Sequence, residues 1–279
     1  MDPNTILLIF SFIFGAAVGS FLNVCIYRLP NDISLVFPSS HCTSCKKPIP
    51  FYHNIPIISY LVLGGRCYNC KEKYSWDYPL VEFLAGLLSL LLFIKYGPTI
   101  NFVFLFIFVM SLIVITFIDL EHMIIPNVIS YPGVVVGLIY SALITDYDSL
   151  RFLLDNLHYN FLYILYVLDE VRIFSSVFGA FIGAGSLLLI GFAYKNVRKM
   201  DGLGLGDVKL MAMVGAFLGW RSIIFVALIS SLIGTIIGIG IMLRNKGDLK
   251  YAIPFGPFIS FAATLYCFCG DLSLDYFID

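Results

Sequence analysis

Four cysteines in the first quarter of the chain have the spacing of a metal site. Cys42 and Cys45 form one Cys-x-x-Cys pair, and Cys67 and Cys70 form a second, with 21 residues between the pairs. Each pair turns two thiolates toward one point, and a ligand set of four sulfurs selects tetrahedral zinc. The spacing therefore predicts a structural zinc site. A pair of redox dithiols or disulfides is the alternative, and a reducing cytoplasmic location would argue against it.

Two aspartates at the ends of apolar segments have the chemistry of an acid–base pair. Asp119 closes a long uncharged run, and Asp207 follows Gly204 and Gly206 directly before another apolar run. Carboxyl groups near membrane depth are rare and usually functional. Two that lie close together share a proton, so that one acts as base and the other as acid when water attacks a peptide carbonyl. The two glycines permit non-helical backbone or a close approach, which predicts an active-site loop.

Each aspartate also has a plain structural interpretation. Asp207 before an apolar run is a good helix N-cap, and Asp119 is compatible with a simple polar residue at the membrane boundary. The Gly-x-Gly pattern also suggests a phosphate-binding loop, but no predicted strand precedes it, which weakens that match.

The composition and the apolar segments of the chain predict that these residues are positioned by the helices of a membrane protein. Of the 279 residues, 59% are hydrophobic and only 13% are charged, against about 25% charged in soluble domains. A net charge of −1 gives no basic surface for a nucleic acid. Eight apolar segments are candidates for helices that cross a lipid bilayer. They are Ile6–Tyr27, Pro79–Tyr96, Ile100–Ile118, Val128–Ile144, Ile173–Tyr194, Val208–Trp220, Ser222–Leu243 and Ile253–Cys269.

Positive charge orients these segments. With the N-terminus outside, the excess of Lys and Arg on inner loops accounts for all 17 basic residues except Lys95, Arg151, Arg172 and Arg221. The sixth segment is the shortest, and length alone leaves a topology of seven helices open. Without it, however, Arg244–Lys250 would lie outside, so the charge pattern favours eight helices with both termini outside. The cysteines and both aspartates then face the cytoplasm.

The predicted fold is an all-α polytopic membrane protein with about eight transmembrane helices and a small cytoplasmic zinc-binding insertion. Residues 1–27 form the first helix, 28–78 the four-cysteine zinc domain, and 79–279 the membrane catalytic domain with seven further helices. The insertion has few aliphatic residues, so we expect metal binding to supply its folding free energy. Asp146–Arg172 is predicted to be an external loop that carries an interfacial amphipathic helix.

Short motifs in a fixed order resemble those of the bacterial type IV prepilin peptidases, integral-membrane aspartyl proteases of the GxGD type. They are Gly19–Asn23, Tyr27–Pro30, Asn54–Pro56, Gly65–Cys67, Tyr78–Glu82, Asp119 with Pro126, Gly204–Asp207 with Lys209, and Pro254–Pro257. Thr43 is a departure, because many members have proline after the first cysteine. Glu82 and Lys209 match family positions, but their chemistry alone assigns them no role.

The resemblance implies cleavage of the basic leader from prepilins or pseudopilins at the cytoplasmic face of the bacterial inner membrane. Asp119 and Asp207 carry over as the catalytic pair. Many members also methylate the new N-terminal amine with S-adenosylmethionine, which would join zinc as a second cofactor. The alternatives are a transporter or proton channel whose two carboxylates relay ions, and a thiol oxidoreductase, which conflicts with the charge pattern.

Overall fold

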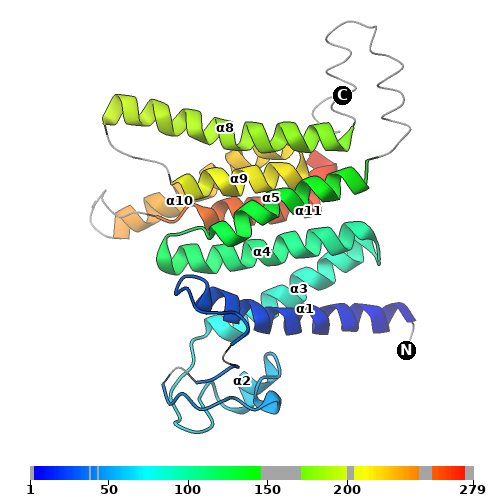
Figure 1. Cartoon of the computed structure of the whole chain (residues 1–279), viewed down its shortest axis with the longest axis vertical. Coiled ribbons are helices and arrows are strands. Elements are labelled where there is room, and N and C mark those ends of the chain that lie inside the picture. The colour runs from blue at the N-terminus through cyan, green and yellow to red at the C-terminus, as the bar shows by residue number, and fades with distance from the viewer. Residues whose placement is uncertain are drawn as a thin grey trace, which may run out of the picture. The chain divides into compact units, whose positions relative to one another are not determined.

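The computed structural model describes residues 3–37, 39–42, 44–145, 171–199, 204–244 and 253–273. Within these ranges the regular structure is helical apart from two isolated β-bridges (Figure 1), which confirms the all-α prediction. The chain divides into two compact units, Met1–His122 and Met123–Asp279. Nearly all of the predicted external loop, residues 146–170, lies outside the described residues.

The first unit contains three long helices and a loop segment that carries the cysteines. The helices are α1 (Pro3–Arg28), α3 (Asp77–Tyr96) and α4 (Ile100–His122), and the segment between α1 and α3 holds only η1 (Phe51–His53) and α2 (Ile58–Val62). Each of the three long helices contacts the other two. The first unit therefore consists of three packed apolar helices and one segment with little regular structure.

Small residues let α1 and α3 approach closely. The hydroxyl oxygens of Ser11 and Ser89 are 3.0 Å apart. A Cβ atom added to Gly15 would overlap the Ser89 side chain, and one added to Gly19 would lie 2.8 Å from the Cα atom of Glu82. Contacts between small residues and interhelical hydrogen bonds are the usual means of holding helices together in lipid. They fix the register of the two helices that flank the cysteine segment.

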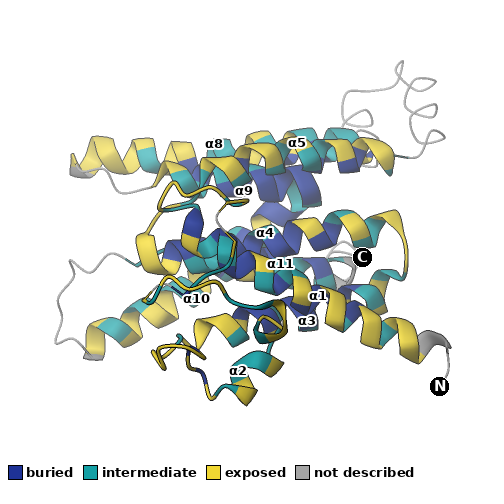
Figure 2. Cartoon of the chain, turned by 60° about the horizontal axis from the view of Figure 1, so that its bottom comes forward, coloured by how far each residue is buried: buried dark blue, intermediate teal, exposed yellow. Residues whose placement is uncertain are grey.

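In the described part of the second unit, four longer helices surround one short helix. Helices α5 (Asn127–Leu143), α8 (Arg172–Arg198), α10 (Trp220–Arg244) and α11 (Gly256–Ser273) all contact α9 (Leu205–Leu218). Figure 2 shows buried residues along α9. They are Val208, Leu210, Met211, Met213, Val214, Gly215, Ala216 and Phe217. Because side chains are buried along most of its length and four helices contact it, α9 is a core helix of this unit.

Each of the eight predicted apolar segments coincides with a helix. Five of these helices, α1, α3, α4, α8 and α10, are long and apolar enough to cross a membrane, and α5 and α11 are shorter. The 14 residues of α9 extend about 21 Å at 1.5 Å per residue, less than the roughly 30 Å of a hydrocarbon core. The predicted bounds 208–220 are wrong at both ends, because Gly206 is helical and Gly219, with φ of 82°, breaks the helix.

Candidate active site and metal centre

The four predicted cysteines gather at one point. Their Sγ atoms all lie within 4.8 Å of one another, and those of Cys42 and Cys70 are 3.8 Å apart. Sulfurs bound tetrahedrally at a zinc–sulfur distance of about 2.3 Å are separated by about 3.8 Å. A disulfide would require about 2.05 Å. The cluster therefore has the dimensions of a four-thiolate metal site, such as one for zinc.

The two Cys-x-x-Cys turns have the same backbone hydrogen bonds. The N–H of Cys42 donates to the carbonyl of Lys47 at 3.0 Å, and the N–H of Lys46 donates to the carbonyl of Cys42 at 2.9 Å. Cys67 makes the equivalent two bonds at 2.8 and 3.0 Å. Lys46 and Lys71, each directly after the second cysteine of its pair, have φ of 57° and 61°. Both turns thus close through a left-handed residue, a conformation uncommon outside glycine.

Hydrogen bonding prepares one sulfur for metal binding. The backbone N–H of Cys70 lowers the pKa of Cys67 to about 6, against the opposing effect of burial. The pKa of Tyr74 is raised, first by burial and then by its hydrogen bond to Cys67. Both groups lie outside the membrane-type helices. A thiolate at Cys67 and a neutral phenol at Tyr74 are therefore favoured, and the thiolate is the form that binds a metal.

Asp119 lies in the last turn of α4 with its side chain buried at 5% exposure. The next two residues, Leu120 and Glu121, are exposed. A simple boundary residue would face outward like these neighbours. Asp119 instead continues the buried face of Ile115 and Ile118, and burial of a carboxyl group favours a functional interpretation.

Asp207 occupies the first turn of α9. Gly204 is the N-cap residue of this helix, so the interpretation of Asp207 as the N-cap is wrong. The N–H of Asp207 donates to the carbonyl of Gly204 at 3.2 Å. A Cβ atom added to Gly204 would lie 3.4 Å from Oδ2 of Asp207, so the carboxylate folds back over the N-terminal turn.

The predicted active-site loop at Gly204 and Gly206 is only partly a loop. Gly204 has extended backbone, whereas Gly206 lies inside α9. A Cβ atom added to Gly206 would lie 3.0 Å from the Cβ of Ile125. Gly206 is therefore required for a close approach, and its backbone conformation is one that any residue adopts.

Two residues that sequence reasoning left without a role form contacts between distant segments. Nζ of Lys209 donates to Oδ1 of Asn127 at 2.6 Å and lies 5.2 Å from the ring centre of Tyr131. These contacts tie the N-terminal part of α9 to the N-terminal part of α5. Oε2 of Glu82 accepts the N–H of Ile57 at 2.7 Å, which ties α3 to the cysteine segment. No local pattern reveals such partners.

The structure brings the four cysteines together and leaves the aspartates in separate units. Asp119 belongs to the first compact unit and Asp207 to the second. Their pairing stays a prediction.

Family models match both parts of the chain. The bacterial peptidase A24 N-terminal domain matches residues 13–96, and the type IV leader peptidase family matches residues 106–239. No solved structure matches.

Similar proteins named prepilin leader peptidase/N-methyltransferase occur in several bacteria. That of Legionella pneumophila is 33% identical over 95% of this chain and 92% of its own length. The proteins of Aeromonas salmonicida strain A449 and Pseudomonas putida are 32% and 31% identical, each over 93% of this chain and over 90% and 89% of their own lengths. Since these matches cover nearly the whole sequence, the chain, a multi-pass membrane protein, belongs to the type IV leader peptidase family.

Proposed function

We propose that this protein cleaves the leader peptide from prepilins or pseudopilins at the cytoplasmic face of the bacterial inner membrane and then methylates the new N-terminal amine. The observation that carries the proposal is the contact between Gly206 and Ile125. It packs the turn that holds Asp207 against the segment that directly follows Asp119. The names of the relatives supply the substrate class.

Chain connectivity supports a pair of aspartates. Asp119 precedes Ile125 by six residues, and six residues of extended chain span at most about 21 Å. The chain therefore limits the distance of Asp119 from Ile125 to that length, which is compatible with a pair. Burial of Asp119 and the position of Asp207 over a helix N-terminus give the two carboxyl groups different surroundings. Different surroundings are what assign one carboxyl as base and its partner as acid.

The proposed reaction needs no group beyond water and the two carboxyls. The ionised carboxyl takes a proton from water as the water oxygen attacks the scissile carbonyl carbon. The protonated carboxyl donates its proton to the carbonyl oxygen, which gives a tetrahedral intermediate. The amide nitrogen then takes the proton that the other carboxyl removed from water, and the carbon–nitrogen bond breaks to release an amine. A hydroxyl proton of the intermediate returns to the first carboxyl. The products are the free leader and a mature N-terminus.

The cofactors of the proposal have separate tasks. Zinc on Cys42, Cys45, Cys67 and Cys70 would be structural, because four thiolates fill its coordination shell and leave no open position. S-adenosylmethionine would supply the methyl group. The excess of Lys and Arg in and around the cysteine segment supports a cytoplasmic position for it.

Incubation of the purified full-length protein with a synthetic prepilin segment tests the proposal. The segment carries a basic leader and the first apolar residues of the mature pilin, and mass spectrometry follows its products. We expect one cut that releases the leader and, with S-adenosylmethionine, a single methyl group on the new N-terminus. An intact substrate beside protein that has its full zinc content, together with proton flux through proteoliposomes, would instead support the transporter, which no comparison favours.

A further inference from the structure

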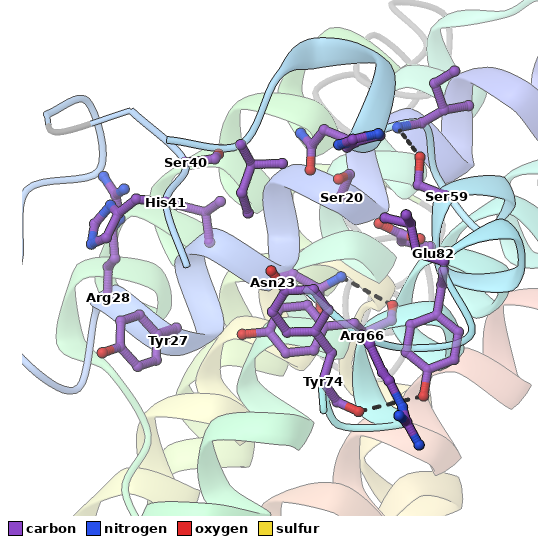
Figure 3. A pocket seen from close by; sticks show the side chains of 18 residues that line it. Ser20, Asn23, Tyr27, Arg28, Ser40, His41, Ser59, Arg66, Tyr74 and Glu82 are labelled. Atoms are coloured by element: carbon purple, nitrogen blue, oxygen red, sulfur yellow. Dashed lines mark hydrogen bonds between the residues drawn. The ribbon is translucent and has the colours of Figure 1, made fainter. Parts of the chain in front are cut away.

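A cavity of about 150 Å³ lies within the first unit, where the cysteine segment meets α1 and α3 (Figure 3). Neither Asp119 nor Asp207 lines it. Its wall combines aromatic rings with both signs of charge. The residues that give it this character are Tyr27, Tyr60, Tyr74, Tyr78, Arg28, Arg66 and Glu82. The cavity is thus separate from the residues proposed for peptide cleavage, and its chemistry has no part in that reaction.

Glu82 is a fixed, buried carboxylate in this wall. It is 8% exposed, and its Oε2 accepts the N–H of Ile57. Among the described residues, no Lys, Arg or His side chain forms an ion pair with Glu82. Burial without a cation disfavours the ionised form of a carboxyl group, so a ligand that brings a positive charge to Glu82 is stabilised as the carboxyl ionises.

Aromatic rings give the same cavity a second preference for cations. The Tyr60 ring packs on Trp76 with centroids 5.4 Å apart, and its hydroxyl donates to the carbonyl of Tyr74 at 3.4 Å. The rings of Tyr74 and Tyr78 are 6.1 Å apart. The faces of such rings attract ammonium and sulfonium groups and also pack against apolar chains.

His53 also lines this cavity. Its ring packs against Tyr52 and Tyr68 with centroids 4.6 and 4.7 Å away. In the part of the chain that the structure describes, its buried Nδ1 atom has no partner. Buried polar atoms are costly when unpaired, so a ligand that reaches this nitrogen gains affinity. Arg66 lines the same cavity, and a guanidinium matches the two oxygens of a carboxylate.

We propose that this cavity binds the methionine part of S-adenosylmethionine. The inference rests on the proposed methylation. Glu82 and the tyrosines meet the sulfonium and ammonium charges, and an arginine meets the carboxylate. A cavity of about 150 Å³ accepts a group of about the size of benzene, so the adenosine part lies at the opening, where Tyr27 and Ile55 are 43% and 44% exposed.

Methyl transfer from S-adenosylmethionine to the pilin amine needs no further reactant. The amine nitrogen of the cleaved pilin bonds to the methyl carbon as the carbon–sulfur bond breaks. The sulfonium becomes a neutral thioether, and the nitrogen releases one proton to solvent. Cleavage and methylation then use different parts of the protein, so that a variant can lose one without the other.

Calorimetric titration of the full-length protein with S-adenosylmethionine tests the site directly. Glu82→Gln keeps an acceptor for the N–H of Ile57 but removes the charge, and we expect its affinity to fall about tenfold or more. His53→Phe keeps the ring packing but removes the nitrogen, and we expect a loss of about threefold or more. Glu72→Gln is the matched control, because Glu72 is exposed and outside the cavity. Its affinity should not change.

The outcomes separate this inference from the function on which it rests. A wild-type protein that methylates a cleaved prepilin, beside Glu82→Gln and His53→Phe variants that bind with unchanged affinity, overturns the cavity assignment and leaves the function intact. A wild-type protein that neither binds S-adenosylmethionine nor methylates overturns both. Zinc content at the wild-type level identifies folded variants, and if Glu82→Gln fails this criterion, His53→Phe decides the matter.

Discussion

The cysteine segment and helix α9 hold their functional residues by opposite means. Between α1 and α3 the described chain has only η1, α2 and two β-bridges, and large side chains such as Phe51 and Val62 are 86% and 79% exposed. In α9, Leu210 and Val214 are fully buried. The cysteine segment has almost no apolar core and has a cluster of sulfurs with the dimensions of a metal site. Helix α9 lies in a dense apolar core, and no described residue of it belongs to a metal cluster. Their stabilities should therefore respond to different perturbations.

Removal of zinc gives the largest expected effect and should be confined to the first of these regions. Structural zinc contributes on the order of 10 kcal/mol to the folding of small domains. We expect about one zinc per chain, lost in Cys67→Ser and on chelation, with new protease cleavage in residues 29–76. Hydrogen exchange in α9 should not change. Cys267→Ser is the control, because Cys267 is a buried thiol of α11 outside the cluster. Equal zinc loss in both variants would refute the four-cysteine site.

A substitution of glycine by alanine where α9 packs most closely on α8 tests the helical core. A Cβ atom added to Gly215 in α9 would overlap the backbone carbonyl of Gly179 in α8. We expect Gly215→Ala to lower the stability of the helical unit by about 2–4 kcal/mol, because backbone cannot move aside as a side chain can. Thermal unfolding in detergent measures this, and the zinc content should stay the same.

The control for that variant is Gly185→Ala in α8. Nothing lies within 4 Å of a Cβ atom added there, and alanine is the better helix former by about 1 kcal/mol. Its melting temperature should be equal or higher. If Gly185→Ala were as damaging as Gly215→Ala, the contact between α8 and α9 would not be the cause.

The two glycines before Asp207 should differ in sensitivity. Gly206→Ala forces its Cβ to within 3.0 Å of Ile125, whereas Gly204→Ala meets Asp207 Oδ2 at an ordinary 3.4 Å. We expect Gly206→Ala to cost about 1–2 kcal/mol in stability and to slow prepilin cleavage, and Gly204→Ala to cost less than about 1 kcal/mol. Parallel unfolding and cleavage rates check the order. The reverse order would contradict the packing of the Asp207 turn on Ile125.

The smallest expected effect is at the link between α5 and α9. The side chains of Lys209 and Asn127 are hydrogen-bonded at 2.6 Å but solvent-accessible, and exposed polar pairs contribute at most about 1 kcal/mol. A double-mutant cycle with Lys209→Met and Asn127→Ala should give a coupling energy below that value. Strictly additive effects on stability would show that the bond does not hold the two helix ends together.

Patterns of neighbouring residues in the sequence predicted the features that depend on neighbouring residues. The cysteine spacing located the metal cluster, and the apolar runs located every membrane-type helix among the described residues. The start of α9 was misjudged because Gly206 reads as a helix breaker in sequence, whereas packing on Ile125 makes a glycine necessary inside the helix. Tertiary contact overrides intrinsic propensity in such places.

The sequence did not predict which residues far apart along the chain contact each other. Gly179 meets Gly215, and Glu82 meets the N–H of Ile57, across 36 and 25 residues. Neither pair has a signature in its own neighbourhood. The cavity beside Glu82 follows from such contacts, so that a candidate binding site for the methyl donor became visible only in three dimensions.

The most direct test of the central claim compares prepilin cleavage by Asp119→Asn, Asp207→Asn and the double variant. Each protein is first shown to have wild-type zinc content and melting behaviour. Because two carboxyls that share a proton act as one unit, we predict that either single change reduces cleavage to the background and that the double variant is no slower. A folded single variant that keeps substantial activity, or a double variant whose loss is the product of two partial losses, would contradict a catalytic pair.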